Sequence, residues 1–577
     1  VKAKNSENLL EFTRDRKTGL VTEERQGEHT VSRTYDDEGY CTRITSSLGA
    51  DIRHTYDREG NLQTMQAGES WQASWVRDNT GLEVQRTFSG GVTVSTERDR
   101  FGREVRKSVR SGGIERGAYR YEWGVANRLL AKENELTGTV MRYDYDRFDF
   151  LIRQETIQGS ETDVIYRVPD FVGNLFETPD KKDRKYGAGG KLLEDPDCFY
   201  HYDDEGNLIF REFKQLQETG VRYDRKRMEK ERGIRCLATG TGWLYEWASN
   251  GMLKKVIRPD GRPVEFRYDA LGRRTAKQYF GKITRWVWDR NVPIHEWSYK
   301  VIDIQSDEEE STPLKEPTED ITTWVFEAGT FVPTAKIQDG KQYSIVSDYL
   351  GTPIQMYDEQ GNKTWDCTLD IYGKVLAIDK GTEFDCPFRY QGQYEDEETG
   401  LYYNRFRYYD SNAGSYISQD PIGLESDTLN FYDYVCDLND GIDPLGLYNP
   451  YGNKKGGGFK KKPGRKPNKK TSLHGNCRTS TKPAVLYAQY DSEGNFMKYG
   501  ITQEIDNPMA RYRNTIPSDW EVVEMTRGNR SDMLDLEREL SEKVGGPLNQ
   551  ESWAGTKRGD PLSPKAEAVH TKMQSHH

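Results

Sequence analysis

The stretch that decides the fold is Thr55–Met65, TYDREGNLQTM, which repeats the phrase TYDDEGYCTRI of Thr34–Ile44 after 21 residues. In each copy an extended segment ends in Tyr-Asp, a short turn contains a glycine, and a second extended segment follows. Glycine takes the positive φ that a tight turn requires, so each copy predicts a β-hairpin. Three further clear copies are YHYDDEGNLIFRE at Tyr200–Glu212, FRYDALGRRTAKQY at Phe266–Tyr279 and QMYDEQGNKTW at Gln355–Trp365.

A single hairpin is marginally stable, so the copies are expected to stack side by side into a continuous sheet. The composition favours such a structure: aromatic residues make up 12% of the chain, with 35 Tyr and 54 Gly. A chain of 577 residues is also too long for one hydrophobic core. We therefore expect a large repeat architecture together with at least one further domain.

The repeats resemble the tyrosine-aspartate (YD) repeats of the Rhs family over most of residues 30–447, and the same repeats occur in insecticidal toxin complexes and teneurins. The resemblance implies a mainly β fold in which YD-repeat hairpins form a spiralling hollow shell, or cocoon. Residues after the shell are expected to form a small α+β nuclease-like domain, for the reasons given below. On this basis residues 1–388 form the shell, with an acidic insertion at 303–321. The alternative is an array of surface hairpins for adhesion, which binds glycans or partner cells.

Composition also narrows the classes of protein. The seven cysteines show no CxxC spacing, which argues against zinc fingers and a disulfide framework. No run of 18 apolar residues predicts a membrane span, and the first residues lack the layout of a signal peptide. They resemble the middle of a longer protein.

Residues 389–447 resemble the conserved closing section of Rhs cores, and DPLGL at Asp443–Leu447 resembles its terminal mark. In that family the core cuts its own chain after the final Leu, which here is the Leu447–Tyr448 bond. Such a cut needs one group to activate a nucleophile and another to protonate the leaving amide, and two neighbouring carboxyl groups can do both.

The phrase Asp-Pro-x-Gly-Leu occurs twice, at 420–424 and at 443–447, and the resemblance assigns the autoproteolysis to the two aspartates, Asp420 and Asp443. Asp433, in NFYDYV, is a third candidate. Gln419 stands where relatives often have Arg, and this departure leaves a neighbouring cation without an assigned role. The alternative interpretation is that Asp-Pro and Gly-Leu only build turns, as they do in many proteins.

The charge of the chain changes sign after Leu447. Residues 448–577 carry 22 Lys and Arg against 15 Asp and Glu, whereas residues 1–447 carry 61 against 79. Nine of the basic residues fall between Lys454 and Lys470 among Gly, Pro and Asn, which predicts a flexible basic linker over 448–480. A basic module attracts a polyanion such as nucleic acid or the acidic shell itself.

Residues 481–577 predict a compact C-terminal domain. Strands are expected at 485–490 and 496–501, and pairing of Tyr490 with Phe496 would put Tyr487 directly opposite Tyr499 on one face. A third strand is expected in WEVVEMT, residues 520–526. A helix follows, whose apolar stripe is Met533, Leu536, Leu540 and Val544.

Glu537 falls on the apolar face of this predicted helix, where a carboxylate needs a metal ion or hydrogen bonds. The order of residues resembles the GIY-YIG nuclease domain, which implies Glu537 as the metal ligand. The other positions that the resemblance carries over are Tyr487, Tyr499 with Gly500, Arg511 and Asn549. The first motif, which corresponds to GIY, reads Val485-Leu-Tyr487 and lacks its Gly. The second reads Lys498-Tyr499-Gly500, and alignment on Gly500 places Lys498 instead of Tyr499 at the tyrosine position. A Glu at the domain rim paired with an arginine is the alternative.

Together these patterns predict an Rhs effector that encloses its own C-terminal domain and releases it as a DNA nuclease dependent on Mg²⁺ or another divalent cation. The resemblance implies a cognate immunity protein, delivery from a bacterium by a type VI or similar secretion system, and action in the cytoplasm of a target cell. The remaining alternative is a ribonuclease or deaminase tail.

Overall fold

The computed structural model describes residues 1–214, 242–301, 316–423, 429–447, 483–493, 496–502 and 521–529, together with Met533, Leu536, Leu540, Glu567, His570 and Thr571. The chain forms two compact units, Val1–Gly464 and Arg465–His577, and each is described by itself. Within these residues the first unit is built almost wholly from antiparallel strands, which confirms the predicted fold class.

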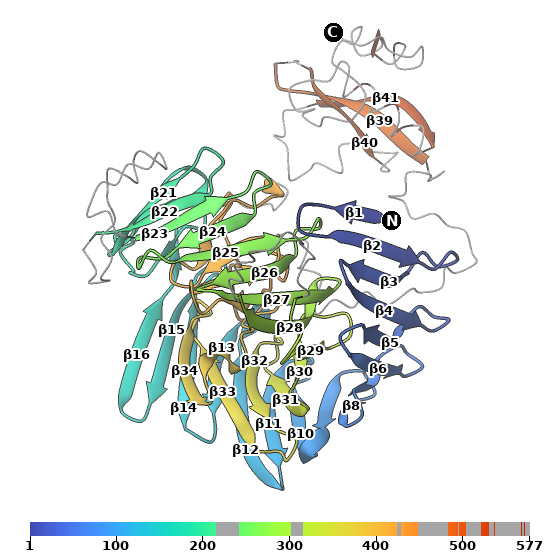
Figure 1. Cartoon of the computed structure of the whole chain (residues 1–577). Coiled ribbons are helices and arrows are strands. Elements are labelled where there is room, and N and C mark those ends of the chain that lie inside the picture. The colour runs from blue at the N-terminus through green and yellow to red at the C-terminus, as the bar shows by residue number, and fades with distance from the viewer. Residues whose placement is uncertain are drawn as a thin grey trace, which may run out of the picture. The chain divides into compact units, whose positions relative to one another are not determined.

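The first sheet contains sixteen strands in chain order within the described residues, so every strand except the two at the edges pairs with the strand before and after it (Figure 1). Its strands are β1 (Lys2–Lys4), β2 (Leu9–Arg14), β3 (Val21–Gln26), β4 (His29–Tyr35), β5 (Cys41–Ser46), β6 (Asp51–Tyr56), β7 (Leu62–Ala67), β8 (Trp71–Arg77), β9 (Glu83–Phe88), β10 (Val92–Arg98), β11 (Glu104–Ser111), β12 (Ile114–Trp123), β13 (Leu129–Asn134), β14 (Thr139–Tyr145), β15 (Leu151–Gln158) and β16 (Glu161–Tyr166).

A second sheet, green to yellow in Figure 1, likewise holds sixteen described strands in chain order. They are β19 (Lys185–Tyr186), β20 (Leu192–Glu194), β21 (Cys198–Tyr202), β22 (Leu208–Phe213), β23 (Gly242–Trp247), β24 (Leu253–Ile257), β25 (Pro263–Tyr268), β26 (Arg274–Tyr279), β27 (Lys282–Asp289), β28 (Val292–Lys300), β29 (Thr322–Phe326), β30 (Pro333–Gln338), β31 (Lys341–Ser347), β32 (Pro353–Tyr357), β33 (Lys363–Leu369) and β34 (Val375–Lys380). The pair β17 (Val168–Pro169) and β18 (Leu175–Phe176) connects the two sheets along the chain. Short 3₁₀ turns are η1 (Ser89–Gly91), η2 (Val125–Asn127), η3 (Ala188–Gly190) and η4 (Glu383–Asp385).

The tyrosine and the aspartate of the Tyr-Asp phrase make the same kinds of hydrogen bond in several repeats. The tyrosine hydroxyl at the end of one hairpin strand donates to a backbone carbonyl of the preceding hairpin, as Tyr56 does to Cys41 O at 2.9 Å. The following aspartate accepts backbone N–H groups of its own turn, as Asp57 does from Asn61 at 2.8 Å. The tyrosine therefore joins neighbouring hairpins and the aspartate closes the turn. The same tyrosine bond is made by Tyr35, Tyr145 and Tyr268.

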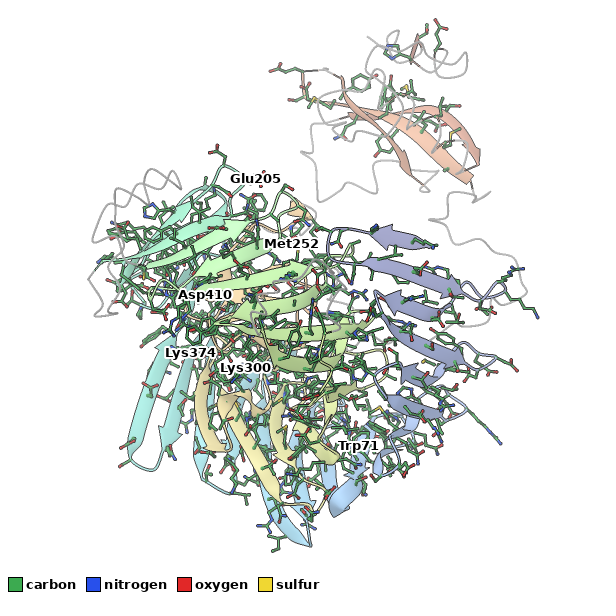
Figure 2. The ribbon with its side chains drawn as sticks, in the orientation of Figure 1. Trp71, Glu205, Met252, Lys300, Lys374 and Asp410 are labelled. Carbon is green, nitrogen blue, oxygen red and sulfur yellow. The ribbon has the colours of Figure 1, made fainter. Side chains whose placement is uncertain are left out.

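The two large sheets share a hydrophobic core, which includes residues of β4–β15 and of β27–β32. Trp71, labelled in Figure 2, is 1% exposed and donates from Nε1 to Ser344 Oγ of β31 at 3.1 Å. Lys107 Nζ donates to Ser347 O at 2.9 Å. Burial between the sheets supplies the core that no single hairpin has.

Residues 429–447 run from one sheet to the other. Arg167 donates to Val435 O at 2.6 Å, and Tyr349, in the turn between β31 and β32, donates to Asn439 O at 2.9 Å. Asn439 in turn donates to Tyr145 of β14 at 3.2 Å. This segment therefore depends on the assembled shell for its position.

In the second unit, strands β39 (Pro483–Tyr490), β40 (Phe496–Thr502) and β41 (Glu521–Asn529) form a sheet in the order β40-β39-β41. The three predicted strands are confirmed to within a few residues. The described stripe residues Met533, Leu536 and Leu540 are helical and buried in the core that covers this sheet. Within the described residues, no helix is long and apolar enough to cross a bilayer.

A buried histidine at the junction of the sheets makes the shell sensitive to acid. His295 is 0% exposed between Ser46 Oγ, 2.6 Å from Nε2, and Thr323 Oγ1, 3.0 Å from Nδ1. Burial lowers the pKa of His295 to about 3. The unfolded chain, whose His pKa is about 6.5, therefore binds this proton first, and stability is lost as pH falls from about 6.5 towards 3, by about 1.4 kcal/mol per pH unit.

We predict that His295→Gln, which keeps a polar partner but does not titrate, makes the stability of the shell less dependent on pH in this window. The measurement is the unfolding midpoint of the wild-type chain and of the variant at pH 7, 6, 5 and 4. Identical slopes for the two proteins would contradict the prediction.

Candidate active site

A small four-stranded sheet presents the candidate site. Its strands are β35 (Tyr394–Glu395), β36 (Leu401–Asn404), β37 (Arg407–Asp410) and β38 (Ser415–Tyr416). A two-residue turn joins β36 to β37, so Asn404 and Arg407 face each other in register. Asp410, labelled in Figure 2, ends β37 and forms an ion pair with Arg211 of β22 at 3.0 Å. The sheet is thereby tied to the shell wall.

Two of the predicted acids meet on one arginine that the sequence did not single out. Arg407 Nη2 lies 2.9 Å from Asp420 Oδ2 and 3.5 Å from Asp443 Oδ2. Exposed fractions are 1% for Arg407, 7% for Asp420 and 3% for Asp443. Loss of one partner from such a buried pair leaves an uncompensated charge and typically costs about 3–5 kcal/mol.

The DPLGL segment is bound along β36 and β37 by its backbone. Arg407 Nε donates to Gly446 O at 2.5 Å, and the Phe406 N–H donates to Leu445 O at 3.2 Å. The Leu447 N–H donates to Asp443 Oδ1 at 2.9 Å. The residue before the predicted scissile bond is thus fixed directly to one of the two acids.

A tyrosine and an asparagine complete the network. Tyr416 donates to Asp443 Oδ2 at 2.7 Å, and its ring lies 3.6 Å from the Arg407 guanidinium. Asn404 Nδ2 lies 2.7 Å from the Tyr416 hydroxyl and 2.9 Å from Asp443 O. Sequence reasoning missed Arg407, Tyr416 and Asn404. The signal that could have found two of them is NRFR at 404–407, a two-residue turn that brings its polar ends together.

The electrostatics favour a site that keeps a proton. Burial raises the pKa of Asp443, while Arg407, the Tyr416 hydroxyl and backbone N–H groups act in the opposite direction. Burial also raises the pKa of Asp420, and the charge of Asp443 raises it further against the effect of Arg407. A carboxyl pair that holds one proton can supply an acid and a base at once.

Asp433, the third candidate, lies beside this network. Its backbone bridges Ser415, and a Cβ at Gly173 would lie 2.9 Å from its Oδ2. Burial raises the pKa of Asp433 well above its usual value. In the described part of the chain, no hydrogen bond joins its carboxylate to Asp420, Asp443 or Arg407.

Gln419 is not part of the acid pair. A Cβ at Gly206, in the turn between β21 and β22, would lie 2.1 Å from Gln419 Nε2, which places this amide against the turn. The cation beside the acids is Arg407, which comes from β37 instead of from the position before Asp420.

In the second unit, one predicted juxtaposition is wrong. Tyr490 does pair with Phe496, but a bulge after Gln489 shifts the register, so Tyr487 faces Gly500 and Tyr499 faces Ala488. Neighbouring strand residues point to opposite faces, and so the two tyrosines lie on opposite faces of the sheet.

Tyr499 belongs to the core that covers the helical stripe, and its hydroxyl lies 2.9 Å from His570 Nδ1, a partner that sequence reasoning missed. Arg511, Glu537 and Asn549 lie outside the described residues. Among the residues that are described, no group of three or more His, Cys, Asp and Glu could hold a metal ion.

Comparison with known proteins supports this fold and its class. Residues 177–437 match the family model of the teneurin YD-shell. Over 472 residues the chain is 29% identical to double-stranded DNA deaminase toxin A of Burkholderia cenocepacia, covering 77% of this chain and 30% of that protein. Over 449 residues it is 28% identical to the probable deoxyribonuclease RhsB of Dickeya dadantii, covering 74% and 28%.

A solved structure has the same architecture. The Tc holotoxin pore of Photorhabdus luminescens matches 78% of this chain and 24% of its own, with a TM-score of 0.53 and 16% identity. The first unit therefore has the YD-shell fold. The matches further support an Rhs-type YD-repeat toxin core, and the chain spans less than a third of the length of the two curated relatives named above.

Close packing of the DPLGL segment gives a test of its binding. A Cβ at Gly392, where φ is +88°, would lie 2.2 Å from Pro444 O, whereas a Cβ at Gly400, where φ is +68°, meets nothing within 4 Å. We predict that Gly392→Ala displaces the segment and that Gly400→Ala does not, although both carry the strain of positive φ.

The measurement is hydrogen exchange of the Phe406 and Leu447 amides, whose N–H groups bind Leu445 O and Asp443 Oδ1. Exchange should be at least about tenfold faster in Gly392→Ala than in Gly400→Ala, since each factor of ten corresponds to about 1.4 kcal/mol of local opening. Equal protection in both variants would contradict the packing argument.

Proposed function

We propose that this chain is part of an Rhs effector that cuts itself after Leu447 and so releases residues 448–577 as a DNA-directed toxin. One observation carries the proposal: two buried carboxyl groups, Asp420 and Asp443, share Arg407, and one of them accepts the N–H of Leu447. General acid–base hydrolysis requires both acids close to the bond to be cut, and the shared Arg407 keeps Asp420 near the acid that accepts the Leu447 N–H.

The reaction is a hydrolysis that consumes one water. One carboxylate accepts a proton as the water oxygen bonds to the carbonyl carbon of Leu447. The bond to the Tyr448 nitrogen then breaks, and the protonated carboxyl donates its proton to that nitrogen. Arg407 holds the Gly446 carbonyl and offsets the negative charge of the acids.

Turn formation alone does not account for this arrangement. Asp420 does close a turn, since its Oδ1 accepts the Ile422 N–H at 3.0 Å. A turn aspartate can remain in solvent, however, whereas the other oxygen of Asp420 is buried on Arg407. Burial of two acids and one arginine costs folding free energy, and clusters of this kind are typical of functional sites.

Enclosure of the C-terminal domain would account for the opposite charges of the two parts of the chain. An acidic shell attracts a basic domain, and we propose that the shell encloses the C-terminal domain until delivery. A free nuclease would damage the cell that makes it, so the proposal includes a cognate immunity protein. Delivery by a type VI or similar secretion system into a target cell belongs to the same proposal, which the toxin names of the relatives support.

For the released domain we propose metal-dependent DNA cleavage of the GIY-YIG type. A lone carboxylate such as Glu537, completed by water and phosphate oxygens, suits Mg²⁺, which would stabilise charge on the phosphate. Arg511 would offset that charge and Asn549 would close the site. Because Tyr487 and Tyr499 lie on opposite faces of the sheet, at most one of them serves as the phenol beside this site.

Base deamination is a second candidate reaction for the C-terminal domain, because the relatives do not share one activity. One of them is named as a DNA deaminase and another as a probable deoxyribonuclease, although each matches about three quarters of this chain. Sequence similarity over about three quarters of the chain is therefore shared by relatives with different activities, and it does not indicate which reaction the C-terminal domain catalyses.

We predict that the wild-type chain yields a fragment of residues 448–577 that begins at Tyr448. Asp420→Asn and Asp443→Asn should each slow its formation by at least about a hundredfold, because general acid–base catalysis contributes roughly 10²–10⁴ in rate. Asp440→Asn, in the same segment but exposed, is the matched control and should cut normally. Intact mass and N-terminal sequencing detect the fragment, and an uncut wild-type chain would contradict autoproteolysis.

We predict that purified residues 448–577 nick supercoiled plasmid in the presence of Mg²⁺ and that EDTA or Glu537→Ala abolishes nicking. Glu539→Ala is the control, because helical periodicity puts residue 539 away from the face of residue 537. Deaminated bases in unnicked DNA, or cleavage of RNA alone, would instead establish one of the other reactions.

A further inference from the structure

The hydrogen bonds around Asp443 have a fixed direction. The backbone carbonyl of Asp443 can only accept, so the Asn404 atom 2.9 Å from it must be the amide nitrogen. The same NH₂ group is 2.7 Å from the Tyr416 oxygen, which therefore accepts. The proton of the Tyr416 hydroxyl is left to point at Asp443 Oδ2, 2.7 Å away.

This direction distinguishes the two acids. Asp443 accepts from the Tyr416 hydroxyl and from the Leu447 N–H, with Arg407 Nη2 at 3.5 Å. Asp420 accepts from Arg407 at 2.9 Å and from the Ile422 N–H at 3.0 Å. Arg407 serves both acids, and so, within the described part of the chain, Tyr416 is the side-chain donor that belongs to one acid alone.

We propose that Tyr416, oriented by Asn404, is a positioning residue that holds Asp443 as the proton-accepting carboxylate and leaves Asp420 as the proton donor. This assignment rests on the proposed autocleavage. Asp443 takes the proton of the water that attacks Leu447, and Asp420 gives its own proton to the Tyr448 nitrogen as the C–N bond breaks. Each cut leaves the proton on Asp443 in place of Asp420 and consumes one water.

Among the described residues, four charged or titratable groups face Asp443. They are Arg407 of β37, Tyr416 of β38, Asp420, and Tyr434 of the closing segment. Of these, Arg407 and Tyr416 favour the carboxylate form of Asp443. Removal of the Tyr416 hydroxyl should therefore make Asp443 harder to ionise, and the acidic limb of the pH–rate profile should move to higher pH.

A merely structural tyrosine would behave differently. Tyr409 is the register partner of Tyr416, is equally buried at 1% exposure, and donates to Tyr372 O at 2.6 Å outside the acid network. Tyr409→Phe therefore removes a buried hydroxyl from the same small sheet without touching Asp443. It is the matched control for Tyr416→Phe.

The experiment synthesises the full 577-residue chain in a cell-free system with a short pulse of label and follows the fragment of residues 448–577 between pH 4.5 and 9. Tyr416→Phe should move the acidic limb upward by about one pH unit, so that the rate on that limb falls about tenfold, and should regain a rate within about threefold of wild type at high pH. Tyr409→Phe should leave the limb where it is.

Asn404→Ala is the second variant, and it should move the limb in the same direction because the tyrosine loses its orientation. Circular dichroism and thermal melting of catalytically inactive Asp420→Asn forms of each variant report folding. An unmoved limb in both variants, or an equal loss of rate at every pH, overturns the role of Tyr416 while autocleavage stands. A wild-type chain that is never cut overturns the proposed function itself.

Discussion

The hydrogen bond from a tyrosine hydroxyl to a carbonyl of the preceding hairpin is the interaction on which the shell depends. Tyr56, Tyr145 and Tyr268 make it at widely separated places in the chain. Because the bond reaches back about fifteen residues, it fixes each hairpin against its neighbour and not merely within itself. The aspartate that follows closes the turn, and so two adjacent residues specify both the bend and the stacking.

Stacking in chain order explains why so large a structure needs no elaborate topology. Each inner strand pairs with the strands before and after it in the sequence, and the two sheets then bury their apolar faces in a shared core. Hydrogen bonds with Arg167, Tyr349 and Tyr145 hold the closing segment of residues 429–447 against this assembled surface. A site that includes this segment therefore relies on the assembled shell, which suits the proposed self-cleavage.

The candidate active site also depends on contacts between segments that are distant in the sequence. Two aspartates separated by 22 residues in sequence are brought to one guanidinium because β37 carries Arg407 between them. The site buries its charges, fixes Leu447, the residue before the proposed cleavage point, and gives its two acids different hydrogen-bond partners. These are the conditions under which carboxyl groups of one kind can act separately as acid and base.

The sequence by itself determined the hairpins, their stacking, the strands of the C-terminal domain and the segment that holds Asp420 and Asp443, because alternation, turn residues and repeated phrases are local signals. Only the tertiary structure decided that Arg407 joins the acids, that Gln419 faces another turn and that Tyr487 and Tyr499 occupy opposite faces. The first two are contacts between segments distant in sequence, and the third depends on one bulge, which shifts a register by a single residue and so turns a side chain to the other side of the sheet.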